Sequence, residues 1–281
     1  MNQLLVNRIQ DKSHTHIMGI LNVTPDSFYD GGRYLCPEDA AAHVEKLVSD
    51  GADILDVGAE SSRPGSVPVD VAEELTRILP AINAALASGL PVSVDTRHAE
   101  TARQALELGA IMINDITGMR GDPQMVEVIA DYGCACVIMH MQGAPQTMQD
   151  SPRYNDIVGD ICTFFSERVD VALSRGVRED RIWLDPGFGF GKTVEHNLEM
   201  LRRFEEFRQL GLPLLLGTSN KSTIGAVLDA PPDDRLEGTA ATVAIAACKG
   251  VHCVRVHDVK FMARMVRMCD AVLRGRKQNY V

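Results

Sequence analysis

The strongest constraint in the sequence is a repeated pattern, in which a short apolar run is followed by a segment with helical spacing. Most of the runs are rich in Val, Ile and Leu without alternating polar residues, which is typical of parallel strands covered on both faces. The pattern occurs eight times, with runs at His16–Leu21, Asp53–Val57, Val92–Val94, Ile111–Ile113, Cys136–Met139, Ile182–Leu184, Leu214–Leu216 and Cys253–Val256.

The segments between these runs have the spacing of amphipathic helices. Examples are Val71–Leu86, in which Pro80 is a candidate kink, Thr101–Leu108 and Tyr154–Arg175. Several of these segments end at a glycine, which suits the left-handed backbone of a helix C-cap. These glycines are Gly51, Gly109, Gly176 and Gly211.

Eight strand–helix repeats without a break in composition predict one closed parallel barrel, an α/β fold of the TIM-type (β/α)8 class. A length of 281 residues suits such a barrel, so we expect residues 1–281 to form a single domain. An open, doubly wound sheet is the alternative. Residues Gln3–Ile9 precede the first repeat and are expected to form a short N-terminal cap over the lower end of the barrel.

Charge and composition exclude several classes of protein. The formal net charge is −10, and the one tight basic cluster is Arg274–Lys277, so a nucleic-acid partner is not expected. No stretch is long and apolar enough to predict a membrane span or a membrane partner. The seven cysteines are scattered, and Cys134 and Cys136 do not form a CxxC motif, which indicates free core thiols and a cytoplasmic protein.

Polar side chains follow every predicted strand, where the loops of a barrel meet and catalytic groups gather. An aspartate after a strand is often only a turn former or helix cap, which explains each member but not the whole set. The ring consists of Asn22, Asp56, Asp95, Asn114 with Asp115, His140, Asp185, Ser219, and Arg255 with His257.

This ring divides by chemistry. Asp95, Asn114 and Asp185 are short acceptors and amides, suited to the edge of a flat heterocycle rich in N–H donors. Neutral and cationic side chains of the ring and of the loops next to it suit phosphate oxygens, and they are Asn22, Arg63, Lys221, Arg255 and His257. The residues alone therefore predict a site for a nucleobase-like ring that carries phosphate.

Two sequence motifs, for phosphate binding and for metal binding, are incomplete. The stretch Pro186–Thr193 resembles a P-loop, but Pro186 stands where the first glycine is needed, so we interpret it as a flexible loop able to approach a ligand. His14 and His16 have no third ligand nearby in the sequence, which favours surface or edge histidines over a metal site.

Three segments strongly resemble the dihydropteroate synthases, namely LNVTPDSFYDGG (Leu21–Gly32), DVGAESSRPG (Asp56–Gly65) and DPGFGFGK (Asp185–Lys192). Supporting matches are SVDT (Ser93–Thr96), IND (Ile113–Asp115), MHMQG (Met139–Gly143) and RVHDV (Arg255–Val259). The resemblance runs in order from residue 14 to about residue 270. It implies a transferase of folate biosynthesis that joins 7,8-dihydropterin-6-methyl pyrophosphate to p-aminobenzoate and releases pyrophosphate.

The resemblance also assigns roles to residues of this chain. It implies that Asp95, Asn114, Asp185, Lys221 and Arg255 bind the pterin. It implies that the pyrophosphate is bound by Asn22, Arg63, Arg255 and His257, with Mg²⁺ near Asn22, and that Asn22, Lys221, Arg255 and His257 are catalytic.

Other groups are implied for p-aminobenzoate. These are Ser219 and Ser222, the start of a helix near Lys221, and Phe190. The loops Thr24–Tyr34 and Glu60–Val67 are expected to close over the site and carry Phe28, Ser62 and Arg63. The resemblance further implies a homodimer and a target of sulfonamides.

The chain departs from the family pattern at three positions. Asn220 stands where arginine is usual, Ser62 where threonine is usual, and Ala59 where glycine is common. Because Asn220 and Ser62 lie in the p-aminobenzoate half, a non-catalytic pterin-binding homologue is one alternative function. A methyltetrahydrofolate-type methyltransferase barrel is another, although such an enzyme has no use for the Arg255–His257 phosphate pair.

Overall fold

The computed structural model of the protein describes residues 3–24, 37–61, 66 and 69–275, and within this part eight parallel strands form one sheet in the order β6-β5-β4-β3-β2-β1-β8-β7. A parallel bridge between Leu184 and Leu214 joins the two edge strands, so the sheet closes into a barrel and not a doubly wound layer. The strands are β1 (His16–Asn22), β2 (Ile54–Gly58), β3 (Val92–Asp95), β4 (Met112–Asp115), β5 (Ala135–Met139), β6 (Ile182–Asp185), β7 (Leu215–Leu216) and β8 (Cys253–Val256).

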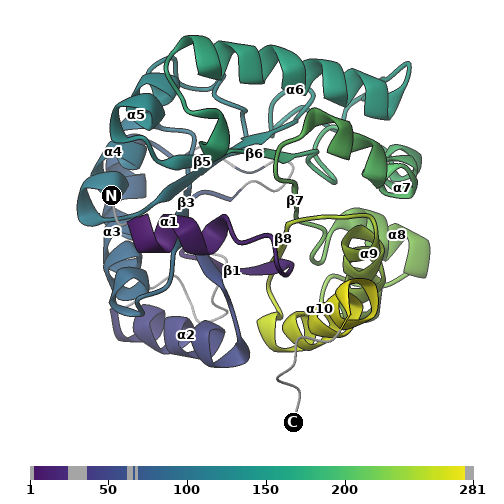
Figure 1. Ribbon diagram of the computed structural model, residues 1–281, viewed down its shortest axis with the longest axis horizontal. Helices are drawn as coiled ribbons and strands as arrows, with labels where there is room; N and C mark the ends of the chain where they lie inside the picture. Colours follow the sequence, from purple (N-terminus) through teal and green to yellow (C-terminus); the bar gives the residue numbers. More distant parts are fainter. Residues whose placement is uncertain (1–2, 25–36, 62–65, 67–68, 276–281) are drawn as a thin grey trace.

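All eight predicted strands are present, shifted by no more than two residues at either end. Apart from α1, the helices form a ring outside the strands (Figure 1). They are α1 (Gln3–Ile9), α2 (Pro37–Asp50), α3 (Val71–Ala87), α4 (Ala99–Leu108), α5 (Met125–Tyr132), α6 (Ile157–Ser174), α7 (Val194–Arg202), α8 (Ser222–Leu228), α9 (Leu236–Cys248) and α10 (Val259–Arg274), with 3₁₀ turns η2 (Glu179–Arg181) and η3 (Phe204–Leu210).

Helix α10 illustrates why these segments form and pack. Its first turn is capped by Asp258, whose carboxylate accepts a hydrogen bond of 2.9 Å from the N–H of Phe261. Val259, Met262 and Val266 recur at helical spacing and are buried against the barrel. Burying each such side chain contributes about 1.5–3 kcal/mol.

The glycines predicted to end four helices have the expected backbone conformation, and Pro80 does not end its helix. All four predicted glycine caps have positive φ, between 72° at Gly211 and 123° at Gly109. Pro80 lies inside α3, which continues through it to Ala87. The short helix α8, inserted between β7 and α9, is an addition to the simple repeat.

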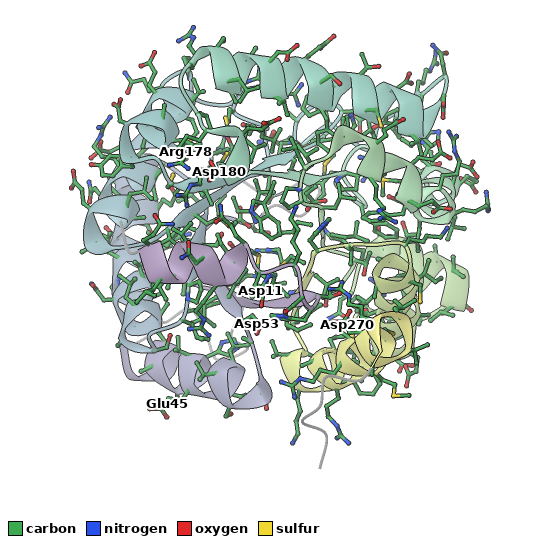
Figure 2. All side chains as sticks on the ribbon, viewed as in Figure 1. Asp11, Glu45, Asp53, Arg178, Asp180 and Asp270 are labelled. Carbon is green, nitrogen blue, oxygen red and sulfur yellow. The ribbon has the colours of Figure 1, made fainter. Side chains whose placement is uncertain are left out.

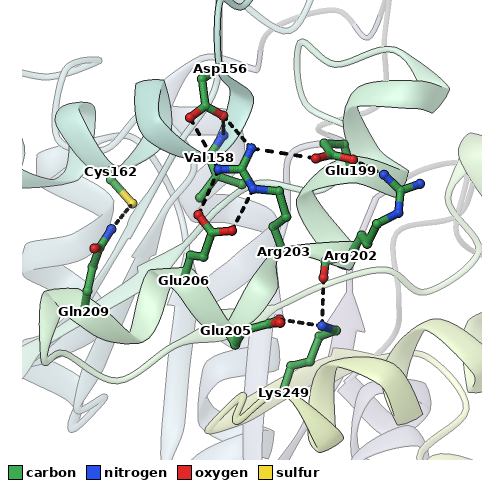
Figure 3. A network of polar contacts seen from close by, with 10 residues as sticks. All are labelled: Asp156, Val158, Cys162, Glu199, Arg202, Arg203, Glu205, Glu206, Gln209 and Lys249. Atoms are coloured by element: carbon green, nitrogen blue, oxygen red, sulfur yellow. Dashed lines mark hydrogen bonds and ion pairs between the residues drawn. The ribbon is translucent and has the colours of Figure 1, made fainter.

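Ion pairs tie neighbouring outer helices together. Arg203, between α7 and η3, binds both Asp156, which caps α6, and Glu206 (Figure 3). Lys249, at the end of α9, donates to Glu205 and to the carbonyl oxygen of Arg202. These contacts are mostly solvent-exposed, so each contributes little to stability.

The N-terminal segment closes the lower end of the barrel, as predicted. Helix α1 crosses this end (Figure 1), and its Val6 and Ile9 are buried. They pack in one cluster with side chains from the amino-terminal halves of the strands, including Met18, Ile54 and Trp183. Catalytic groups of such a barrel lie at the opposite, carboxyl-terminal end.

The cysteines of the described chain are free thiols. Cys134, Cys136 and Cys253 are buried, and burial raises the pKa of Cys134 to about 12, so it stays protonated and inert. Among the described residues, no helix combines the length and the apolar character needed to cross a membrane.

Candidate active site

The carboxyl ends of the strands bring the predicted polar residues to one end of the barrel, around Arg255 of β8. Its Nε donates to Oδ2 of Asp56 at 2.6 Å, and its Nη2 donates to Oδ2 of Asp95 at 2.9 Å. Oδ2 of Asp56 also accepts from Nδ2 of Asn114 at 3.2 Å. One guanidinium thus links the ends of β2, β3 and β8, with β4 joined through Asn114.

Asp56 is the residue at the centre of this network, although sequence reasoning gave it no role beyond membership of the ring. Its side chain is fully buried, and its Oδ1 has no hydrogen-bond partner among the described residues. A buried carboxylate oxygen without a partner is costly unless a ligand donates to it. The available signal was a charged residue inside the buried apolar run of β2.

Two carboxyl groups of the site have raised pKa values. Burial, reinforced by Asp56 and Glu74, raises the pKa of Asp95 to about 7 against the opposing charge of Arg255. Burial also raises the pKa of Asp185 to about 6, although the N–H of Gly187 and the charge of Lys221 oppose the shift. Both carboxyl groups therefore change charge near neutral pH, which is typical of functional sites.

The loop after β6 is anchored tightly, in contrast to the flexible loop predicted. Lys192 is 3% exposed and donates to the carbonyl oxygens of Gly187 and Phe190 at 2.9 and 3.0 Å. A Cβ at Gly187, where φ is 68°, would lie 2.0 Å from the carbonyl oxygen of His140. The loop therefore packs directly on neighbouring backbone, which leaves no space for a side chain.

Two members of the predicted ring, His140 and Asp115, make hydrogen bonds that hold loops at this end of the barrel. His140 lies 3.0 Å from Nζ of Lys192, and burial together with that charge lowers the pKa of the imidazole far below its usual value, so neutral Nδ1 can accept. The Asp115 carboxylate accepts from the N–H groups of Thr117 and Met119 within its own turn. Both side chains position loops.

Lys221 and Phe190 face each other across the site. The Lys221 ammonium lies 4.0 Å from the centre of the Phe190 ring, a cation–π contact. Lys221 is the N-cap residue of α8, and exposed Ser222 is its first residue, so the predicted helix start is confirmed. An aromatic face and a cation therefore lie next to the loop after β6.

Ser219 and His257 form a second contact, at the ends of β7 and β8. The Ser219 hydroxyl lies 2.9 Å from Nδ1 of exposed His257 and accepts from its N–H at 3.3 Å. The Ser219 hydroxyl thus fixes the orientation of the His257 ring through Nδ1.

Asn220 has a backbone reason for its identity. Its φ is 57°, a left-handed conformation that asparagine tolerates better than most side chains. Its N–H donates to Thr239 Oγ1 at 3.1 Å, and its carbonyl oxygen accepts from Nη1 of Arg235 at 3.0 Å. The side chain is exposed, so main-chain bonds and the left-handed φ, and no buried side-chain contact, hold this position.

Asn22 ends β1 beside β2 and offers an uncharged amide oxygen. A Cβ at Gly58, its register partner, would lie 3.6 Å from that oxygen and 3.3 Å from Cβ of Asp95. The glycine therefore lets the two polar side chains approach each other. Mg²⁺ prefers oxygen ligands, so the amide oxygen of Asn22 suits the role of one protein ligand to a phosphate-bound magnesium ion.

Several sequence-based assignments lie wholly or partly outside the described residues. Phe28, Ser62 and Arg63 are in this group, as is most of the two loops expected to close. At the base of the second loop, Glu60 accepts two bonds of 2.9 Å from Arg97. Ala59 is fully buried and is not among the residues with positive φ, so alanine replaces glycine there without backbone strain.

Known proteins match the chain over nearly its whole length. A family model described as pterin binding enzyme matches residues 18–257. The dihydropteroate synthase of Escherichia coli K12 is 44% identical over 270 residues, covering 96% of this chain and 95% of that protein.

Solved structures give the same result. The Yersinia pestis dihydropteroate synthase in a sulfonamide drug complex has a TM-score of 0.89 and 41% identity, covering 93% of this chain and 95% of that one. The Xanthomonas albilineans dihydropteroate synthase with 4-aminobenzoic acid has a TM-score of 0.86 and 41% identity, with coverages of 92% and 93%.

Proposed function

Because the chain belongs to the pterin-binding enzymes and, among them, to the dihydropteroate synthases, we propose that its barrel mouth joins 7,8-dihydropterin-6-methyl pyrophosphate to p-aminobenzoate. The products are 7,8-dihydropteroate and pyrophosphate, and the enzyme is a transferase of folate biosynthesis. The observation that carries the proposal is the network of Arg255 with Asp56, Asp95 and Asn114.

The pterin lies against this network and Asp185. Oδ1 of Asp185 accepts from the N–H of Gly187 at 2.7 Å, which orients the carboxylate and leaves lone pairs for two N–H groups of the aminopyrimidine edge. Asp95 and Asn114 bind the remaining polar edge. Arg255 lies against the ring face, and Lys221 reaches the carbonyl and ring-nitrogen side.

The pyrophosphate lies on the neutral and cationic half, formed by Asn22, Arg63, Arg255 and His257. These side chains stabilise negative charge as it develops on the leaving group. Mg²⁺ held near Asn22 would supply further positive charge there when bound. The amide of Asn22 and the ring of His257 orient the phosphate oxygens.

The reaction breaks the methylene carbon–oxygen bond and then forms a carbon–nitrogen bond. Pyrophosphate leaves with the bonding electrons, and the positive charge on the methylene group spreads into the pterin. Carboxylates at the pterin edge, Asp95 and Asp185, favour that positive charge. The neutral aromatic amine attacks without prior deprotonation and then loses a proton, so no strong general base is needed.

p-Aminobenzoate lies beside Phe190, Ser219 and Ser222. The N–H groups at the start of α8 and the Ser222 hydroxyl suit its carboxylate, and the Lys221 ammonium adds positive charge. Phe28 and Ser62 come from the two loops that close over this half. Closure excludes water, which otherwise competes with the amine for the cation.

Binding of the pterin substrate is expected to depend on pH near 6. Asp185 accepts the aminopyrimidine bonds as a carboxylate, and its pKa in the ligand-free protein is raised to about 6. Protonation below that pH turns one carboxylate oxygen into an O–H donor that faces the N–H donors of the ligand, so affinity falls towards a limit of about tenfold per pH unit. Isothermal calorimetry with the pterin pyrophosphate between pH 5 and 8 measures this, and a flat profile would contradict the role of Asp185.

The substitution Asn220→Arg is expected to lower KM for p-aminobenzoate while leaving pterin affinity nearly unchanged. The exposed side chain leaves space for a guanidinium, and one charge-assisted bond contributes roughly 1.5–3 kcal/mol, or about ten- to a hundredfold. Arginine at φ 57° is strained, so Tm is expected to fall slightly. Asn220→Gln is the control, and an equal effect on both substrates would show that the site is not divided in this way.

We propose a single-domain chain that works as a cytoplasmic homodimer and is inhibited by sulfonamides in competition with p-aminobenzoate. Exposed apolar side chains on α9 and α10 support the dimer, among them Phe261, Met268 and Val272, which are 44%, 65% and 71% exposed. Analytical ultracentrifugation tests the dimer, cell fractionation the location, and inhibition kinetics the competition by sulfonamides.

The proposed activity is tested by chromatographic detection of 7,8-dihydropteroate from the purified protein, both substrates and Mg²⁺. Omitting each component in turn shows which of them the reaction needs. Product that forms only when all are present supports the proposal. Tight pterin binding without product would identify the chain as the non-catalytic homologue.

A further inference from the structure

A second cluster of polar groups lies at the amino-terminal end of the barrel, opposite the mouth. His14 precedes β1, His16 is its first residue, and Asp53 directly precedes the neighbouring strand β2. Each residue offers one ligand atom, and these atoms all lie within 4.8 Å of one another. Figure 2 shows Asp53 beside Asp11, close to the start of β1. The third partner that the sequence lacks is thus supplied by strand pairing.

His16 is a buried histidine with one unused nitrogen. The residue is 3% exposed, which corrects its interpretation as a surface or edge side chain. Its Nε2 lies 2.8 Å from the carbonyl oxygen of Asp11, and its Nδ1 is buried with no hydrogen-bond partner among the described residues. A donating Nε2 leaves the lone pair on Nδ1, which is the usual arrangement of a metal-binding histidine.

His14 is oriented in a similar way. Its Nε2 lies 3.7 Å from Oδ1 of Asp53, and its Nδ1 lies 3.7 Å from Oδ2 of Asp11. One ring nitrogen therefore faces the cluster while the other faces a carboxylate. The Ser13 hydroxyl lies closer to the same Nδ1, at 3.4 Å, so polar groups hold that side of the ring.

Asp53 is anchored in a way that leaves one oxygen for the cluster. Its Oδ2 accepts from the N–H of Ile17 at 2.9 Å, while Oδ1 faces His14.

We propose that His14, His16 and Asp53 bind a zinc ion, through Nε2 of His14, Nδ1 of His16 and Oδ1 of Asp53. Two imidazole nitrogens with one carboxylate oxygen suit zinc, whereas magnesium prefers oxygen ligands alone. Water from an adjoining cavity of about 430 Å³, which His16, Asp11 and Trp183 help to line, completes a tetrahedron. The ligand atoms move inward when the ion binds, since tetrahedral zinc bonds are about 2.0–2.2 Å long.

The ion ties the segment before β1 to the start of β2, next to the cluster that α1 closes. Residues at this end of a barrel affect stability, and chemistry occurs at the other end. Zinc is therefore expected to raise Tm without changing the rate of the reaction at the mouth.

The test is calorimetric titration of chelator-treated full-length protein with zinc chloride in excess Mg²⁺, followed by thermal unfolding. One equivalent of zinc is expected to bind, and a zinc concentration one hundredfold above Kd raises Tm by roughly 5 °C. Cobalt in place of zinc should give the intense visible bands of a tetrahedral site.

Two variants separate this site from general binding to histidines. His14→Gln changes a half-exposed side chain, and Asp53→Asn keeps an oxygen for the N–H of Ile17, so both are expected to fold. Each should weaken zinc binding at least tenfold, while His43→Gln on α2 should not. Equal zinc affinity in all four proteins, or no saturable binding to the parent protein, would overturn the proposal.

Discussion

Replacing Arg255 with methionine is expected to lower kcat/KM for dihydropteroate formation by about a thousandfold. The guanidinium binds the carboxylates of Asp56 and Asp95 at 2.6 and 2.9 Å, and Asp56 is fully buried. Removing one member of a buried ion pair leaves an uncompensated charge and lowers the free energy of unfolding by about 3–5 kcal/mol. The same substitution leaves both carboxylates without the cation that orients them, and a thousandfold loss of kcat/KM corresponds to about 4 kcal/mol of transition-state stabilisation. Steady-state kinetics and thermal unfolding measure the two consequences.

The matched control is Arg97→Met. Arg97 also binds one carboxylate with two bonds of 2.9 Å, but its partner Glu60 lies outside the central network. We expect a much smaller loss of activity there. Arg255→Lys keeps the positive charge but lacks the planar guanidinium with its several N–H donors. It should therefore bind only one of the two carboxylates and give an intermediate loss of kcat/KM. Activity of Arg255→Met within tenfold of the parent would contradict the central place given to this residue.

The substitution Asp185→Asn is expected to raise Kd for the pterin pyrophosphate by about a hundred- to a thousandfold. Asparagine can still accept from the N–H of Gly187, so the local backbone is retained. Its amide donors would face the N–H donors of the aminopyrimidine edge, and a mismatch of buried polar groups costs about 3–4 kcal/mol together with the lost charge. Calorimetry with the pterin substrate measures the change.

For Asp115→Asn we expect the opposite combination of effects on stability and pterin affinity. Asp115 lies at the end of β4, which β5 separates from β6, and its carboxylate accepts from Thr117 and Met119 within its own turn. This variant should lose stability and keep its pterin affinity, whereas Asp185→Asn should keep its stability. If Asp185→Asn bound the pterin as tightly as the parent does, the pterin would have to lie elsewhere in the mouth.

The barrel was predictable because the information for it is local. Each strand is an apolar run with a polar residue at its end, and the pattern repeats eight times, so the ring of side chains follows from the fold class alone. The start of α8 at Ser222 and the cap formed by α1 were visible for the same reason.

Contacts made by closure of the barrel were not predictable. Arg255 and Asp56 are 199 residues apart, and their pairing depends on β8 meeting β1 and β1 meeting β2. Asp53 joins His14 and His16 by the same β1–β2 pairing. The direction in which a strand-end side chain faces was also hidden, as His140 and Asp115 show by facing loops.

The most direct test of the account is release of pyrophosphate by the purified protein with the dihydropterin pyrophosphate and Mg²⁺, measured with and without p-aminobenzoate. We predict release that depends on p-aminobenzoate and matches dihydropteroate formation one to one. Pyrophosphate release at the same rate without p-aminobenzoate, or none with it despite pterin binding, would contradict the proposed condensation.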